Sequence, residues 1–183
     1  MEAMNREYPK LRKEQLNRLF VDGLGDSVKK VTDITAYPLL IDLKDPYPLK
    51  LRVYLFNCTN PPGGRALDEF KIQVIGPGQK PGMKGHFDYS GGRLAILAAF
   101  VQQSEDYNDG IFVLWDADKH PEFSYSANFQ VKADTIIDAL SLPVACAERH
   151  NKEIILAAQP KHLLDAIRMR VDIMNAGILE ECT

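Results

Sequence analysis

Between residues 31 and 131 the chain repeats one pattern, in which a short run rich in Val, Ile, Phe and Tyr is followed by a cluster of Pro, Gly, Asn or Asp. β-Branched and aromatic residues favour strands, whereas Pro and Gly clusters favour turns. The pattern predicts strands at 32–43, 49–57, 68–75, 93–101, 110–117 and 123–131, with turn signals such as NPPGG at 60–64 and NDG at 108–110. We therefore expect a mainly β (α+β) fold, with antiparallel neighbours arranged as a closed or nearly closed barrel.

Helical patterns lie at the two ends of the chain. Leu11, Leu16 and Leu19 are spaced for one face of a helix, and the glycines of VDGLGDS end it. Further helices are predicted at 134–140 and 160–174, with a strand at 153–158 between them. We expect a helical arm or linker over 1–28 and one β domain with a C-terminal helix over 29–183. The segment 93–101 suits a helix as well as a strand, because it is rich in alanine.

Length and composition restrict the class of protein. A chain of 183 residues with 45% hydrophobic and 26% charged residues is typical of one globular domain. It has no apolar run long enough to span a bilayer and no signal peptide, so we expect a cytoplasmic protein without a membrane partner. The three cysteines and four histidines show no metal-ligand spacing, and no complete motif indicates a catalytic residue or a cofactor.

Two predicted strands have one apolar side and one polar side. In DEFKIQV at 68–74 and in SYSANFQVK at 124–132, apolar residues occupy every second position. The polar side chains between them include amides and ammonium groups, which match the hydrogen-bonding edges of adenine and guanine in the major groove of DNA. The plain alternative is a solvent-facing sheet surface without a ligand. The polar positions of interest are Lys71, Gln73, Ser126, Asn128, Gln130 and Lys132.

The loops add cations that suit contact with phosphate. Arg65 directly follows two glycines, where a backbone approaches a groove closely, and Lys119 lies near the tip of the loop after Trp115. The segment 76–92 holds six of the 12 glycines together with Lys80 and Lys84, and Arg93 follows it. The net charge of −3 argues against strong nonspecific binding, although charges act over only about 8 Å at physiological salt. Trp115 itself is expected in the core with its indole N–H satisfied.

Two further functions stay open. Glu69 and Lys71 match the (D/E)xK half of a magnesium-dependent nuclease motif, but the preceding acidic residue is not evident, with Asp42 and Asp45 as the available ones. A protein-interaction barrel without any nucleic-acid role is the other alternative.

The segment VYLFNCTNPPGGRALDEFKIQVIGPGQ at 53–79, followed by HFDYSGGR, GIFVLWDA and FSYSANFQV, resembles the B3-like DNA-recognition domains of restriction endonucleases, of the BfiI C-terminal and EcoRII N-terminal type. The resemblance spans about residues 30–175. It implies an open seven-stranded antiparallel pseudobarrel with short flanking helices and two protrusions that grip double-stranded DNA, with catalysis in a separate nuclease domain or subunit. The expected base readers are Arg65, Asp68, Lys71, Gln73, Ser126, Asn128, Gln130 and Lys132, and the expected phosphate contacts are Lys80, Lys84, Arg93 and Lys119.

Overall fold

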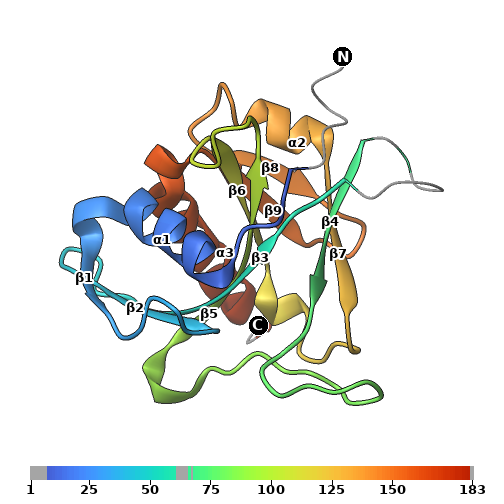
Figure 1. Cartoon of the computed structure of the whole chain (residues 1–183). Coiled ribbons are helices and arrows are strands. Elements are labelled where there is room, and N and C mark those ends of the chain that lie inside the picture. The colour runs from blue at the N-terminus through green and yellow to red at the C-terminus, as the bar shows by residue number, and fades with distance from the viewer. Residues whose placement is uncertain (1–7, 61–65, 67, 182–183) are drawn as a thin grey trace.

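A central β-sheet divides the molecule into layers (Figure 1). The computed structural model of the chain describes residues 8–60, 66 and 68–181. Helices α1 (Lys13–Leu24) and α3 (Leu163–Glu181) cover one face of the central sheet. A separate ribbon of β4 (Glu69–Val74) and β7 (Ala127–Lys132) lies over the other face, together with helix α2 (Ala133–Asp138). Two hydrophobic clusters, one on each side of the sheet, form the core.

The central sheet is seven-stranded, in the order β1-β2-β3-β5-β6-β9-β8. Its pairs are antiparallel except β3 with β5, which are parallel because the connection between them leaves the sheet and builds β4 before returning. The sheet stays open, with β1 and β8 as its edges. Its strands are β1 (Val28–Val31), β2 (Leu39–Leu43), β3 (Lys50–Asn57), β5 (Leu94–Gln102), β6 (Gly110–Trp115), β8 (Ala145–Glu148) and β9 (Ile154–Ala158).

The mainly β class and the open, mostly antiparallel seven-stranded sheet confirm the expected fold class. The expectation of a closed or nearly closed barrel is wrong, because β1 and β8 at the two edges do not pair with each other, and the membership of the sheet also differs from the expectation. Two predicted strands, β4 and β7, pair with each other outside the central sheet. Strands β1 and β8 take their place, and the sequence did not indicate either of them. Each is only four residues long, and their sequences, VKKV and ACAE, lack the sustained apolar alternation of a buried strand.

The ambiguous segment 93–101 folds as a strand because it is buried on both faces. In β5, Leu97 and Val101 belong to the cluster beneath the ribbon, whereas Ile96 and Phe100 belong to the cluster beneath the helices. Strand β6 beside it is also buried along its whole length. A central strand with two buried faces carries a nearly continuous apolar run, which periodicity cannot distinguish from a buried helix.

Helix α1, which lies within the predicted arm, packs onto the sheet through Leu16 and Phe20. The ring centroids of Phe20 and Phe112 on β6 lie 5.4 Å apart in an edge-to-face arrangement. The helix ends at Gly25, whose φ of 54° favours glycine. The boundary at residue 28 stays a prediction. In the part of the chain that the structure describes, no helix combines the length and apolar character needed to cross a membrane.

We expect Phe20→Ala to lower the free energy of unfolding by about 3–5 kcal/mol, because it leaves a cavity between α1 and the sheet. Phe20 is 0% exposed, whereas Ile137 on α2 is 48% exposed. Ile137→Ala is therefore the control and should change stability by no more than about 0.5 kcal/mol. Urea unfolding of both variants measures the difference. A Phe20→Ala protein as stable as the control would show that α1 is not part of the folded core.

Candidate nucleic-acid interface

The β4–β7 ribbon has one buried side and one outward side. Its antiparallel register places Phe70 opposite Val131 and Ile72 opposite Phe129, and these side chains pack into the core cluster beneath the ribbon. Side chains alternate across a strand, so the pairs between them must point away from the core. The outward pairs are Glu69 with Lys132, Lys71 with Gln130, and Gln73 with Asn128. We call this outward side the ribbon face.

The middle of the ribbon face and one of its ends differ in charge. Gln73 and Asn128 are exposed and opposite one another, and Lys71 lies opposite Gln130 on the next pair. At the end of the ribbon near α2, Lys132 Nζ lies 3.2 Å from Glu69 Oε1 and 3.6 Å from Asp68 Oδ1. The hydrogen bond with Glu69 raises the pKa of Lys132. The ribbon face therefore presents an ammonium and three amides beside an ion cluster of one lysine and two carboxylates.

Three further candidates, Ser126, Lys80 and Lys84, lie at or beyond one end of the ribbon. Ser126 directly precedes β7, at the end of the ribbon where β4 continues into the loop that carries Lys80 and Lys84. This loop is joined to the segment before β7 by the bridge between Gly85 and Phe123. Lys80 and Lys84 are both exposed, and Lys84 Nζ lies 4.0 Å from Glu122 Oε1.

Two candidates, Arg93 and Lys119, are not brought onto the ribbon. Arg93 Nη2 lies 2.9 Å from Asp42 Oδ1, and its Nη1 donates to the carbonyl of Leu51 at 3.1 Å, so it braces the central sheet. Lys119 is exposed in the 3₁₀ turn Ala117–Lys119 after β6. Arg65 lies outside the described residues.

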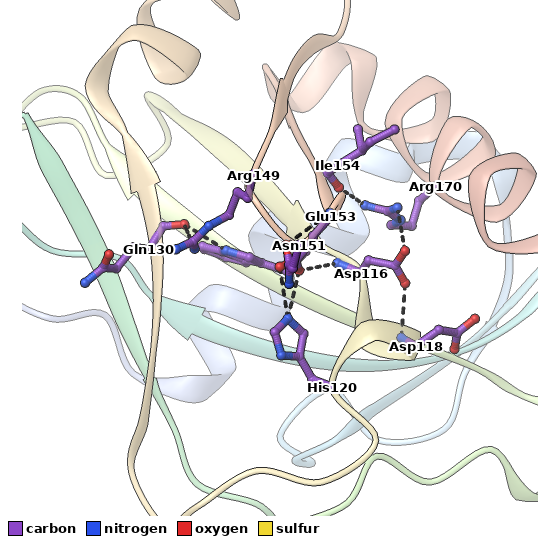
Figure 2. A network of polar contacts seen from close by, with 10 residues as sticks. Asp116, Asp118, His120, Gln130, Arg149, Asn151, Glu153, Ile154 and Arg170 are labelled. Atoms are coloured by element: carbon purple, nitrogen blue, oxygen red, sulfur yellow. Dashed lines mark hydrogen bonds and ion pairs between the residues drawn. The ribbon is translucent and has the colours of Figure 1, made fainter. Parts of the chain in front are cut away.

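A network of polar contacts fixes the ribbon to the central sheet (Figure 2). The main-chain carbonyl of Gln130 accepts hydrogen bonds from Trp115 Nε1 and from Arg149 Nη1, each at 3.0 Å. The Gln130 side chain extends away from this network (Figure 2). Trp115 is 0% exposed, which confirms its expected place in the core with a satisfied indole. The backbone at the centre of the ribbon is thus held by two donors from beneath.

The same network continues through buried charges. His120 Nε2 lies 3.0 Å from both carboxylate oxygens of Glu153, and Glu153 Oε1 also accepts from the backbone N–H of Asp116 at 3.1 Å. Arg170 on α3 lies 3.2 Å from Asp116 Oδ2 and donates to the carbonyl of Ile154. The side chains of Glu153 and Arg170 are almost fully buried. These contacts connect the end of β6, the start of β9 and helix α3 in one cluster.

Burial and pairing shift the pKa values of Asp116 and Glu153 in opposite directions. Burial raises the pKa of Asp116, and Arg170 opposes that rise. Burial also acts to raise the pKa of Glu153, but the hydrogen bond and charge of His120, the N–H of Asp116 and the charge of Arg149 outweigh it. The pKa of Glu153 therefore lies below its ordinary value of 4.5, and Glu153 is ionised at neutral pH.

Two carboxylates that the nuclease alternative would use are paired with basic side chains. Glu69 is engaged with Lys132, and Asp42 is engaged with Arg93 on the central sheet. Within residues 8–60, 66 and 68–181, no group of three or more His, Cys, Asp or Glu side chains is placed to hold a metal ion. The sequence analysis missed the Asp116–Glu153–Arg170 cluster, because its members are far apart in the chain and carry no spacing signal.

Loss of Arg170 should destabilise the protein strongly. Arg170→Ala is expected to cost about 3–5 kcal/mol in the free energy of unfolding, because it leaves the carboxylate of Asp116 buried without its partner. Arg168 on the same helix stacks on the ring of Tyr47, which is 37% exposed, at 3.7 Å. Arg168→Ala is the matched control and should cost at most about 1 kcal/mol. Equal losses for the two variants in denaturant unfolding would contradict a structural role for the buried pair.

The stabilisation by Glu153 should depend on pH. A carboxyl whose pKa is lowered by folding stabilises the protein above its unfolded pKa of 4.5, and this contribution is lost as the pH falls through the folded value. Glu153→Gln should therefore cost about 1.5–3 kcal/mol at pH 7 and clearly less at pH 3. Urea unfolding at both pH values measures this, with the exposed Glu148→Gln as control. A cost that is the same at pH 7 and pH 3 would overturn the assignment.

Comparisons with known proteins find one family. A comparison with curated proteins finds no match, and a comparison with solved structures finds none either. A family model described as methylase-associated X1 matches residues 49–167, from just before β3 into the first turns of α3. The match includes the whole ribbon and most of the buried network, and its description indicates a domain associated with restriction-modification systems. Because the match covers well over half of the chain, the protein belongs to the methylase-associated X1 family.

Proposed function

We propose that this chain is the sequence-specific double-stranded DNA-recognition module of a restriction-modification enzyme, and that its ribbon face reads bases in the major groove. The observation that carries the proposal is the register of the ribbon, which sets Gln73 beside Asn128 and Lys71 beside Gln130 on the outward side. Lys pairs with guanine, and Asn or Gln pairs with adenine, through hydrogen bonds to the base edges.

The dimensions of a two-stranded ribbon support this proposal. The major groove is about 12 Å wide and admits such a ribbon, whose strands lie about 4.8 Å apart. The inner side is sealed against the core, so only the ribbon face is available to a groove. Lys80 and Lys84, in the loop beyond the end of β4, extend the surface with cations suited to phosphate. Asp68, Lys132 and Ser126 flank the readers, and Lys119 and Arg93 lie apart from them.

The B3-like resemblance and the family description support the same proposal from a different direction. The family is described as methylase-associated, and a restriction-modification system must find its target sequence, which a DNA-recognition module would do. In this proposal catalysis belongs to a nuclease domain or subunit elsewhere, the module itself uses no cofactor, and the assembly works in the cytoplasm. Net charge is −3, so specific contacts must supply much of the affinity.

Selection from a randomised duplex pool at about 0.1 M salt tests the proposal and identifies the site. On the selected duplex, Gln73→Ala or Asn128→Ala should weaken binding by about 1–3 kcal/mol and relax discrimination at one base pair. Lys71→Ala should do the same at a neighbouring base pair. Lys29→Ala, an exposed lysine on edge strand β1, is the control and should bind like the wild type. A uniform loss across all sequences would mark a phosphate contact instead of a base contact.

The same experiments separate the alternatives. Failure to retain any duplex would overturn the proposal and favour a protein-interaction role. Incubation with plasmid and magnesium tests the nuclease alternative, in which Glu69 and Lys71 are catalytic. Cleavage that Lys71→Ala abolishes would replace the binding-only account with that alternative.

A further inference from the structure

A cavity lies beside the end of the ribbon where β4 continues into the loop that carries Lys80 and Lys84. Its volume is about 430 Å³, within the range of about 300–1,000 Å³ that small-molecule sites occupy. It is lined by Pro38 just before β2, by Leu40 on β2, by Arg52 and Tyr54 on β3, and by Pro77, His86 and Asp88 of that loop. Tyr54 belongs to the same core cluster as the inner side of the ribbon, so the cavity and the ribbon lie on the same side of the central sheet.

Carboxylates lie beside the basic side chains that line the cavity. Arg52 Nη1 lies 3.3 Å from Asp88 Oδ1 and donates to the carbonyl of Asp88 at 2.7 Å. His86 Nε2 lies 3.6 Å from a carboxylate oxygen of Glu122. A phosphate would have to displace Asp88 from Arg52, and it would meet the Glu122 carboxylate beside His86. These carboxylates therefore favour a neutral ligand over an anion.

The walls combine apolar surface with fixed polar groups. Pro38, Leu40 and Pro77 supply apolar contact, and prolines are rigid. The hydroxyl of Tyr54 accepts from the N–H of Asp88 at 3.0 Å, which leaves its own hydrogen to donate. Burial raises the pKa of Tyr54, so that hydrogen is retained at neutral pH. The site therefore suits a ligand that is flat and uncharged and that carries hydrogen-bond acceptors on its edge.

We infer that the cavity receives a single nucleobase rotated out of the duplex that the ribbon face binds. The inference rests on the proposed function: Pro77 of the cavity follows the end of β4 closely in the chain, so a duplex on the ribbon would lie beside the cavity. Proteins that extrude a base hold it between apolar walls and hydrogen-bond its edge. The cavity offers Pro38, Leu40 and Pro77 as apolar lining, and the hydroxyl of Tyr54, which is 1% exposed, as a donor. The cost of unpairing and unstacking is smallest for a base that is already mispaired, which provides the test.

The test scans the selected duplex with mismatches placed one at a time in each strand, so that every base in turn faces a wrong partner. At base pairs that are read in the groove, a mismatch should weaken binding by the wild-type protein. At the single position of the extruded base, replacing its partner should instead tighten binding about tenfold, because the unpairing cost falls. A wild-type scan in which every mismatch weakens binding or leaves it unchanged would overturn this inference while the proposed function stands.

Amino-acid substitutions test whether the tighter binding at the mismatch depends on the cavity. Leu40→Trp fills the cavity from its wall and should abolish the gain at that one position, whereas Leu142→Trp, at a leucine that is 49% exposed, should keep it. Tyr54→Phe retains the ring and removes the hydroxyl, so it should reduce the gain without filling the cavity. A gain that survives both Leu40→Trp and Tyr54→Phe would place the base elsewhere and contradict the inference. If no duplex is retained at all, the proposed function fails and this inference fails with it.

Discussion

The packing of the ribbon's apolar side against the central sheet determines where the candidate base readers on β4 and β7 point. Ile72, Val74 and Phe129 are at most 5% exposed, and each fully buried side chain of this size contributes about 1.5–3 kcal/mol. A slip of one residue in either strand would bury amides and ammonium groups in their place. The hydrophobic core therefore specifies the register, and the register specifies the ribbon face.

The polar network beneath the ribbon adds a second constraint. Trp115 and Arg149 hold the carbonyl of Gln130, so the centre of the ribbon is fixed by hydrogen bonds as well as by packing. The network reaches α3 through Asp116 and Arg170 on the far side of the sheet. A rigid scaffold of this kind suits recognition, because a reader that is already ordered loses less conformational entropy on binding.

The sequence carried the information about the ribbon and lacked the information about its surroundings. Period-two alternation separated inward from outward side chains within β4 and β7, because that pattern is local. It failed before β7, where Tyr125 was expected on the apolar side and is 37% exposed. Alternation does not reveal the partner of a strand, so the parallel pairing of β3 with β5 and the short edge strand β8 were not evident. Arg93 illustrates the same limit, since a cation in a glycine-rich segment looked available and instead pairs with Asp42. Asp116, Glu153 and Arg170 are far apart in the sequence, so only the structure reveals that they form a cluster.

The family match and the ribbon geometry lead to one central claim, that the outward amides of β4 and β7 meet DNA. The side-chain amide groups of Gln73, Asn128 and Gln130 give their own signals in a nitrogen-15 NMR spectrum of this 20.6 kDa protein. Titration with the selected duplex measures the contact directly. The account predicts that the largest shifts fall on these three amides and on the backbone of β4 and β7. Shifts confined to α1 and α3, on the opposite face of the sheet, would contradict it.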